Sequence, residues 1–143
     1  MIDTTTDTIL HKVYVGSFPQ SSTAIGTKLY VNNTNPNSVS VVDTNTDTVI
    51  KEILLVGSGL VSSTVVGTKL YVSHADSQTV SVIDTSTDTL LSTISIGSSL
   101  TPVSWNPISS TAVGTKLYVT KLTNNELVVI DTTTDTVSTT LSV

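Results

Sequence analysis

Residues 21–31 read Ser-Ser-Thr-Ala-Ile-Gly-Thr-Lys-Leu-Tyr-Val, and nearly the same sequence returns at residues 62–72 and 109–119. In each copy a run of small and apolar residues meets Gly-Thr, and an apolar alternation resumes after it. Gly at the first central position of a two-residue loop is the requirement of a type II′ turn. Each copy therefore predicts a β-hairpin.

A second repeated sequence, Val/Ile-Asp-Thr-x-Thr-Asp-Thr, follows each hairpin at residues 42–48, 83–89 and 130–136, and a further copy opens the chain at residues 2–8. Each complete unit then predicts four strands, in the first unit near residues 22–25, 28–32, 39–42 and 49–56. Units that repeat at a fixed period stack on one another, and four strands per unit is typical of a β-propeller blade. The sequence predicts an all-β fold of three full propeller blades of four antiparallel strands, plus one extra N-terminal strand.

The repeats also predict the division of the chain. Residues 1–17 are expected to form a partial blade consisting of a turn and an outer strand. Residues 18–57, 58–97 and 98–143 are expected to form blades 1, 2 and 3, with an inserted inter-blade loop at 98–109. All of them are expected to belong to one propeller domain or to part of one.

Composition and charge exclude several classes of protein. The chain has 143 residues, of which 38% are hydrophobic, and this is enough apolar material for a globular core. The net charge is −5 and all six basic residues are Lys, so nucleic acid is not an expected partner. No Cys is present to form disulfides or thiolate sites. No apolar run long enough for membrane insertion occurs, and no signal peptide is expected in this sequence.

Most of the eleven acidic residues are the paired aspartates of the repeated turn, such as Asp43 and Asp47. Such pairs can bind calcium, but Asp and Thr side chains also bond their own backbone two residues on. Because the pair recurs in every unit, we expect it to fix the turn. The recurring Lys28, Lys69 and Lys116 are expected to be solvated edge lysines, with an anion-attracting ring as the alternative.

Variation between the units is confined to one end of the predicted blades, where the inter-blade links and the loops between second and third strands lie. This loop face is the candidate binding surface. Its residues are Asn33, Asn35, His74, Asp76, Trp105, Asn106, Lys121, Asn124 and Asn125. Trp105 either contacts a ligand or fills a gap in the core. His74 is expected to be a solvated loop residue, and a His74–Asp76 pair acting as a weak ligand or base is the alternative.

The segments Tyr30-Val-Asn-Asn33, Tyr71-Val-Ser-His74 and Tyr118-Val-Thr-Lys121 each follow Gly-Thr-Lys-Leu and precede the aspartate turn. This pattern resembles the YVTN β-propeller repeat family over essentially the whole chain. The resemblance implies a propeller fold and a setting in surface or exported proteins. Related propellers include lactonase-like enzymes and the amino-terminal domain of nitrous oxide reductase. The turn differs from the family, since a bare Gly-Thr stands where Pro-Asp-Gly is usual.

Apart from the repeated turns, the sequence contains no clear motif for a nucleophile, a metal site or a phosphate site. We therefore expect a non-catalytic structural or binding module of a cell-surface or extracellular assembly, without catalytic residues, metal or cofactor. It is expected to act through self-association and its loop face. The alternative is a lactonase-like hydrolase that uses the same face.

Propellers close with about four to eight blades, so three blades leave two apolar faces to be covered. The expected cover is a second copy of the chain, by blade stacking or strand complementation, in a closed ring or a fibre; the alternative is the remainder of a longer propeller. The opening strand, residues 8–15, is expected to have no partner in its own chain and to dock on a neighbour. Its assembly residues are Ile9, Leu10, Val13, Tyr14 and Val15.

Overall fold

The computed structural model describes residues 2–9, 11–97, 109–121 and 125–143. No helix occurs in these ranges, so none is available to span a membrane. The strands of blade 1 are β3 (Ser17–Ile25), β4 (Lys28–Asn35), β5 (Asn37–Asp43) and β6 (Thr48–Leu54). Those of blade 2 are β7 (Leu60–Val66), β8 (Lys69–His74), β9 (Thr79–Asp84) and β10 (Thr89–Ser95). Those of blade 3 are β11 (Ser110–Val113), β12 (Lys116–Lys121), β13 (Glu126–Asp131) and β14 (Thr136–Ser142).

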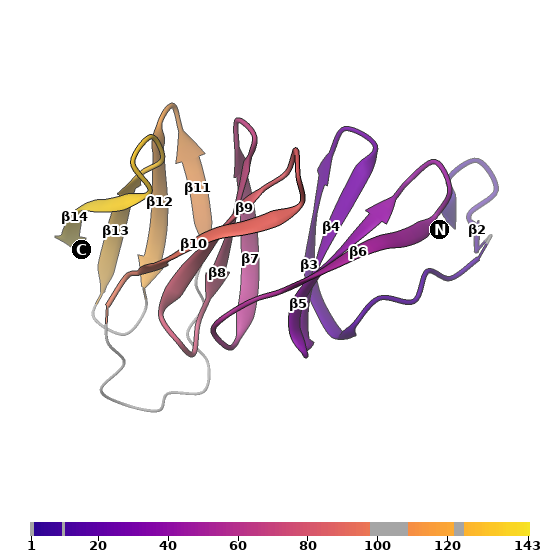
Figure 1. Ribbon diagram of the computed structural model, residues 1–143, viewed down its shortest axis with the longest axis horizontal. Coiled ribbons are helices and arrows are strands. Elements are labelled where there is room, and N and C mark those ends of the chain that lie inside the picture. Colours follow the sequence, from indigo (N-terminus) through magenta and orange to yellow (C-terminus); the bar gives the residue numbers. More distant parts are fainter. Residues whose placement is uncertain (1, 10, 98–108, 122–124) are drawn as a thin grey trace.

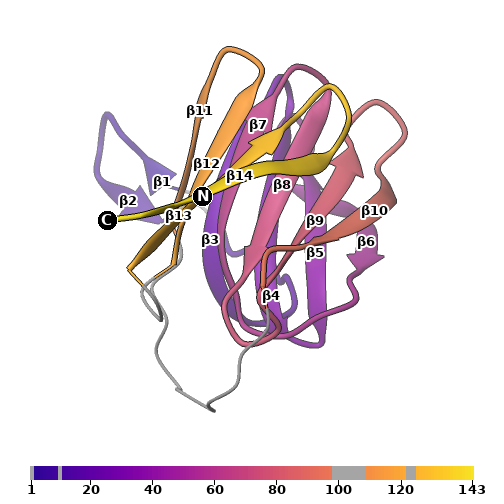
Figure 2. The ribbon, with the colours of Figure 1, turned by 90° about the vertical axis from the view of Figure 1, so that its left-hand side faces the viewer.

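Each blade is a four-stranded antiparallel sheet whose strands lie in chain order. The three sheets stand side by side along the long axis, with the N-terminal hairpin and the C-terminus at opposite ends (Figure 1). A view along that axis shows them overlapping face to face (Figure 2). The predicted fold class, an all-β arrangement of propeller blades, is confirmed.

The local turn signals also form the predicted turns. In blade 1, Ile25 pairs with Lys28 across the two-residue loop, and Gly26 has a φ of 59°. In the second turn, the backbone N–H of Asn45 donates to Oδ1 of Asp43 at 2.8 Å. Blades 2 and 3 repeat both features, so the first aspartate of each complete turn fixes the turn, as predicted.

The core lies between the blades. One apolar cluster fills the space between blades 1 and 2 and includes Tyr30, Val41 and Leu70. A second fills the space between blades 2 and 3 and includes Tyr71 and Leu117. A middle strand covered on both faces loses the apolar alternation of a half-solvated strand, and β5 is indeed buried from Ser38 to Val42.

The first strands of the blades, β3, β7 and β11, are the ones that meet each other. Thr23 Oγ1 lies 2.7 Å from Ser63 Oγ, and Thr64 Oγ1 lies 2.8 Å from Ser110 Oγ. Small hydroxyl side chains allow this approach where the blades converge. The short Ser, Thr, Ala and Val residues of these strands therefore belong to the inner edge of the propeller.

The N-terminal segment differs from its prediction. Only Thr8–Ile9 (β2) is a strand, and it pairs with Ile2–Asp3 (β1) of the same hairpin. Residues 11–15 are not a strand. Val13 and Val15 instead line a groove with Leu29 and Val31 of blade 1. The expectation of an opening strand without a partner in its own chain is wrong, because Thr8–Ile9 pairs with Ile2–Asp3 and Nε2 of His11 lies 3.0 Å from Oδ2 of Asp47 in blade 1. Of the remaining assembly residues, Ile9 and Tyr14 are exposed, and Leu10 lies outside the described residues.

Candidate functional site

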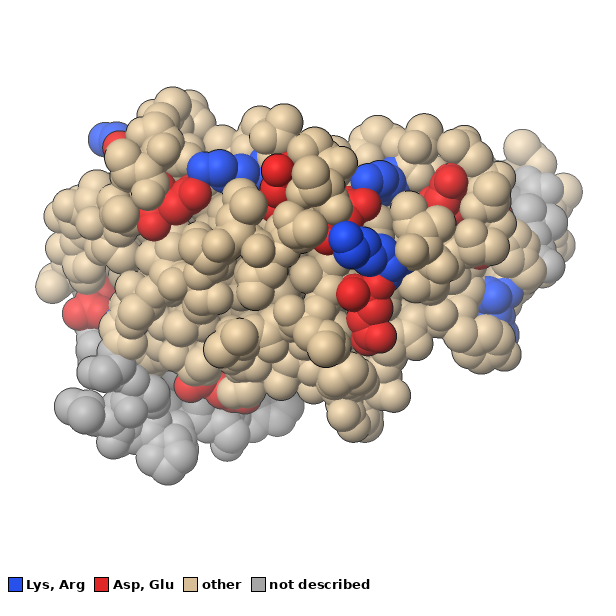
Figure 3. All heavy atoms as spheres, viewed as in Figure 1, with Lys and Arg blue, Asp and Glu red and all other residues tan. Residues whose placement is uncertain are grey.

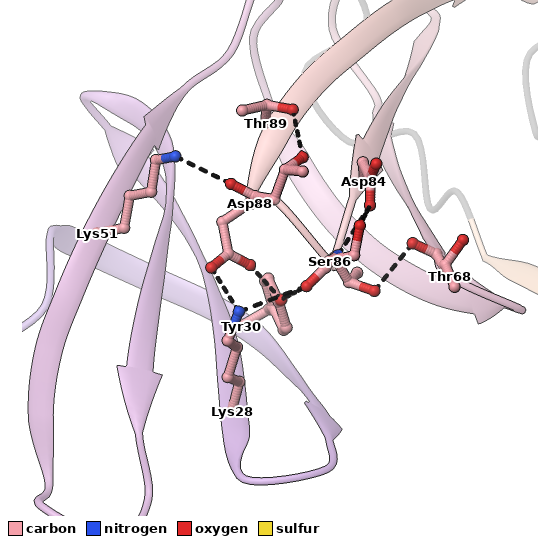
Figure 4. Close-up of polar contacts among 10 residues, drawn as sticks. Lys28, Tyr30, Lys51, Thr68, Asp84, Ser86, Asp88 and Thr89 are labelled. Carbon is pink, nitrogen blue, oxygen red and sulfur yellow. Dashed lines mark hydrogen bonds and ion pairs between the residues drawn. The ribbon is translucent and has the colours of Figure 1, made fainter.

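The junction between blades 1 and 2 carries a cluster of buried and partly buried polar contacts. Lys28 and Tyr30 extend from β4 toward the aspartate turn of blade 2, as Figure 4 shows. Lys28 Nζ lies 2.6 Å from Oδ2 of Asp88, and the Tyr30 hydroxyl donates to Oδ1 of Asp88 at 2.5 Å. Both donors also reach the carbonyl oxygen of Thr85. We refer to these contacts as a Lys-Tyr-Asp junction.

The same junction recurs between blades 2 and 3 with nearly the same geometry. Lys69 Nζ lies 2.7 Å from Oδ2 of Asp135, and the Tyr71 hydroxyl donates to Oδ1 of Asp135 at 2.6 Å. The backbone carbonyl of Thr132 accepts from both. The Lys-x-Tyr pair of one blade thus holds the aspartate turn of the next blade.

Burial shapes the electrostatics of both junctions. The tyrosine rings of Tyr30 and Tyr71 are fully buried, and each hydroxyl faces a carboxylate. Burial, followed by the hydrogen bond to the aspartate, raises the pKa of both phenols far above the usual value. Each tyrosine therefore remains a hydrogen-bond donor at every physiological pH.

These contacts correct two sequence predictions. Lys28 and Lys69 are neither solvated edge lysines nor an anion-binding ring, because each is paired with an aspartate of the next blade. Asp88 and Asp135, the second aspartates of their turns, also have a role beyond fixing the turn, because they bind the lysine and tyrosine of the preceding blade. Lysine and acidic side chains accordingly lie next to each other in a largely uncharged surface (Figure 3).

The structure buries three of the predicted loop-face residues and exposes three others. Asn33, His74 and Lys121 occupy corresponding positions near the ends of second strands, and all three are buried. Each bonds across its own hairpin: Asn33 Nδ2 to Ser40 Oγ, His74 Nε2 to Ser81 Oγ, and Lys121 Nζ to Glu126 Oε2, all at 2.9 Å. All three side chains are bonded within their own blade, and the prediction of a solvated His74 is wrong.

The remaining loop-face residues are exposed or undescribed. Asn35, Asp76 and Asn125 are exposed to solvent. Trp105, Asn106 and Asn124 lie outside the described residues, so the alternative of packing or ligand contact for Trp105 stays open. The structure does not bring the predicted binding residues into one enclosed site within its described part.

A serine–histidine pair is present, but it has the wrong surroundings for hydrolysis. His74 and Ser81 are completely buried. Nδ1 of His74 has no hydrogen-bond partner among the described residues, so no carboxylate orients the ring. Burial also lowers the pKa of His74 to about 4, which makes it a weak base at neutral pH. Within the described ranges, no group of three metal-ligating side chains comes together.

A glycine that precedes each blade in the sequence lies close to these buried polar residues. Gly57 follows blade 1 with a φ of 128° and lies directly over His74 of blade 2. A Cβ at Gly57 would lie 2.8 Å from His74 Nδ1 and 2.7 Å from Ser77 Oγ. Gly16 and Gly97 cover Asn33 and Lys121 in the same way.

Replacing Gly57 by Ala is expected to lower the free energy of unfolding by about 2 kcal/mol, because the side chain meets both the strained φ and these two atoms. Gly67→Ala is the matched control. Gly67 also has a positive φ, of 60°, but open space surrounds the position of its Cβ, so about 1 kcal/mol is expected. Urea denaturation measures both. Equal losses would mean that contact with His74 does not matter.

Comparisons with solved structures agree with this architecture. Hydrazine synthase of Kuenenia stuttgartiensis is similar over 99% of this chain and 42% of its own, with 24% identity and a TM-score of 0.80. AztD of Citrobacter koseri is similar over 81% and 32%, with 18% identity and a TM-score of 0.68. A europium-containing methanol dehydrogenase is similar over 83% and 23%, with 14% identity and a TM-score of 0.66. No protein-family model matches the chain, and no curated protein matches it significantly.

The blades and these similarities define the class of protein: the chain is a β-propeller module. It spans less than half the length of each of these solved structures. At identities below 25% the similarity establishes the fold alone.

Proposed function

We propose that this propeller module is a non-catalytic structural and binding unit that acts by associating with further copies of itself. The observation that carries the proposal is the exposure of the outer face of blade 3. Leu141 and Val143 are 46% and 83% exposed, whereas Ile94 and Ile96, at the same positions of blade 2, are 8% and 5% exposed. Ile94 and Ile96 are covered because they pack against blade 3.

The first blade carries the complementary surface. Leu70, Val72 and Ile83 of blade 2 pack against blade 1. Their equivalents in blade 1, Leu29, Val31 and Val42, line a groove of about 470 Å³ together with Val13 and Val15. The outer faces of blades 3 and 1 are thus repeats of two faces that already pack against each other inside the chain. A second copy of the chain therefore has the surfaces that can cover both outer faces.

Burial of apolar side chains such as Leu141 supplies the favourable free energy for this association, at about 25 cal/mol per Å² of apolar surface removed from water. We also propose that the exposed loop-face residues Asn35, Asp76 and Asn125 bind partners. The YVTN-like repeat supports a setting at a cell surface or outside the cell.

Analytical ultracentrifugation across the micromolar range tests the self-association. We expect the mean mass to rise with concentration above that of one chain, 15.0 kDa. A chain that stays monomeric would contradict the proposal and would assign the two outer faces to other blades of a longer polypeptide.

The hydrolase alternative is tested on the same sample with a panel of lactones and esters. We expect no turnover, because the His74–Ser81 pair is buried and has no third group to orient it. Turnover that His74→Asn or Asp76→Asn abolishes would overturn the non-catalytic assignment.

A further inference from the structure

Half of a Lys-Tyr-Asp junction is open at each end of the described chain. On blade 3, Lys116 and Tyr118 correspond to the donors Lys28 and Tyr30 of blade 1. Neither has a hydrogen-bond partner in the described ranges; Lys116 is exposed and Tyr118 is half-buried. In both completed junctions the tyrosine is fully buried.

The complementary half lies on blade 1. Asp47 is the counterpart of Asp88 and Asp135, with the same left-handed backbone conformation at φ 54°. Its Oδ1 is buried and has no hydrogen-bond partner among the described residues. Its Oδ2 lies 3.0 Å from Nε2 of His11. In the completed junctions the corresponding Oδ1 accepts from tyrosine and Oδ2 pairs with lysine.

We propose that Lys116 and Tyr118 of one copy bind Asp47 of a second copy and complete a third Lys-Tyr-Asp junction between the two chains. This inference rests on the proposed self-association and assigns the residues that direct it. The lysine charge and the aspartate charge are complementary. A buried carboxylate oxygen without a donor is unfavourable, and the tyrosine hydroxyl supplies that donor.

The N-terminal segment occupies part of the place that the incoming blade needs. Val13 and Val15 line the same groove as Leu29 and Val31, and they stand at the repeat positions that Ile94 and Ile96 hold in blade 2. Leu141 and Val143 of an incoming blade 3 require the same position. The segment holding His11 therefore moves aside when the junction forms, and Lys116 and Tyr118 replace His11 at Asp47.

Charge reversal provides the test. Lys116→Glu and Asp47→Lys each place like charges at every junction, so each variant alone is expected to associate at least about tenfold more weakly than the unmodified chain in ultracentrifugation. An equimolar mixture of the two variants is expected to associate again. Where the two variants alternate, each junction between them pairs either Lys116 with Asp47 or the introduced Glu with the introduced Lys.

Two matched variants control for net charge and backbone strain. Lys12→Glu changes an exposed lysine outside the junction. Asp7→Lys changes the equivalent turn position of the N-terminal hairpin, where φ is 51°, close to that of Asp47. Both are expected to associate like the unmodified chain. Tyr118→Phe removes only the hydroxyl and is expected to weaken association about fivefold, which keeps the test decisive if Asp47→Lys fails to fold.

Circular dichroism melts establish which variants are folded. Association of folded Lys116→Glu and Tyr118→Phe at unmodified strength would overturn this junction and leave the self-association standing. A mixture that stays dissociated, or an Asp7→Lys variant that loses association, would also overturn it. An unmodified chain that is monomeric would instead remove the proposed function on which the inference rests.

Discussion

Replacing Tyr71 by Ala is expected to lower the free energy of unfolding by about 4 kcal/mol. The ring is completely buried in the cluster between blades 2 and 3, where it belongs to the same core as Leu117 and Ile130. Its hydroxyl donates to Asp135 at 2.6 Å. The substitution therefore leaves a cavity and removes one of the two side chains that bind the Asp135 carboxylate. Urea denaturation at a concentration where the chain is monomeric measures the loss.

The repeat supplies the controls. Tyr118→Ala changes the same position in blade 3, where the ring is half-buried and its hydroxyl is unbonded in the described ranges, so a loss of about 1 kcal/mol is expected. Tyr71→Phe keeps the ring and loses only the hydrogen bond, with a loss of about 1 to 2 kcal/mol. Equal losses for Tyr71→Ala and Tyr118→Ala would mean that packing between blades contributes little at this position.

The fold was predictable because its signals are local and repeated. Gly26 with Thr27, and Asp43 with Asn45, determine the two turns of a blade within a few residues of sequence, and each blade repeats them. Strand number and pairing then follow from the spacing of the turns. The strand boundaries were less predictable: β3 begins at Ser17, because an interblade link extends the pairing of the first strand.

The Lys-Tyr-Asp junction was not predictable in the same way. Tyr30 and Asp88 belong to different repeats. Because the repeats are nearly identical, the sequence does not show whether a tyrosine contacts the aspartate of its own blade or that of the next blade. The sequence did contain a signal: in each complete turn the first aspartate fixes the turn, so the recurrence of the second requires another reason. The recurring Lys-x-Tyr pair, with both side chains on one face of its strand, matches it.

The sequence analysis assigned the buried polar residues to an exposed loop face for a different reason. Asn33, His74 and Lys121 differ between repeats, and sequence variation at a strand end predicts an exposed loop. The structure buries them, and a glycine that precedes the blade in the sequence lies over each one: Gly16, Gly57 and Gly97. For His74 and Lys121 that glycine follows the preceding blade, so no single repeat reveals the contact. Each of the three side chains makes a hydrogen bond within its own blade, to Ser40, Ser81 or Glu126.

The burial of His74 predicts a dependence of stability on pH. Burial lowers its folded-state pKa to about 4, whereas an unfolded histidine titrates at about 6.5. Between these values the unfolded chain binds a proton that the folded chain does not bind. The contribution of His74 to stability is therefore fully present above about pH 6.5. It is lost as the pH falls, at about 1.4 kcal/mol per pH unit and about 3 kcal/mol in total.

His74→Asn isolates this contribution, because Asn33 occupies the same position in blade 1 and bonds Ser40 as His74 bonds Ser81. Urea denaturation at pH 7, 6, 5 and 4 gives the free energy of unfolding of both chains. We expect the His74 chain to lose more stability than the Asn variant across this range, by about 3 kcal/mol at pH 4. The carboxylates titrate in both chains, so they cancel in the difference. Parallel curves would mean that His74 takes up its proton in the folded chain and is not held neutral between the blades.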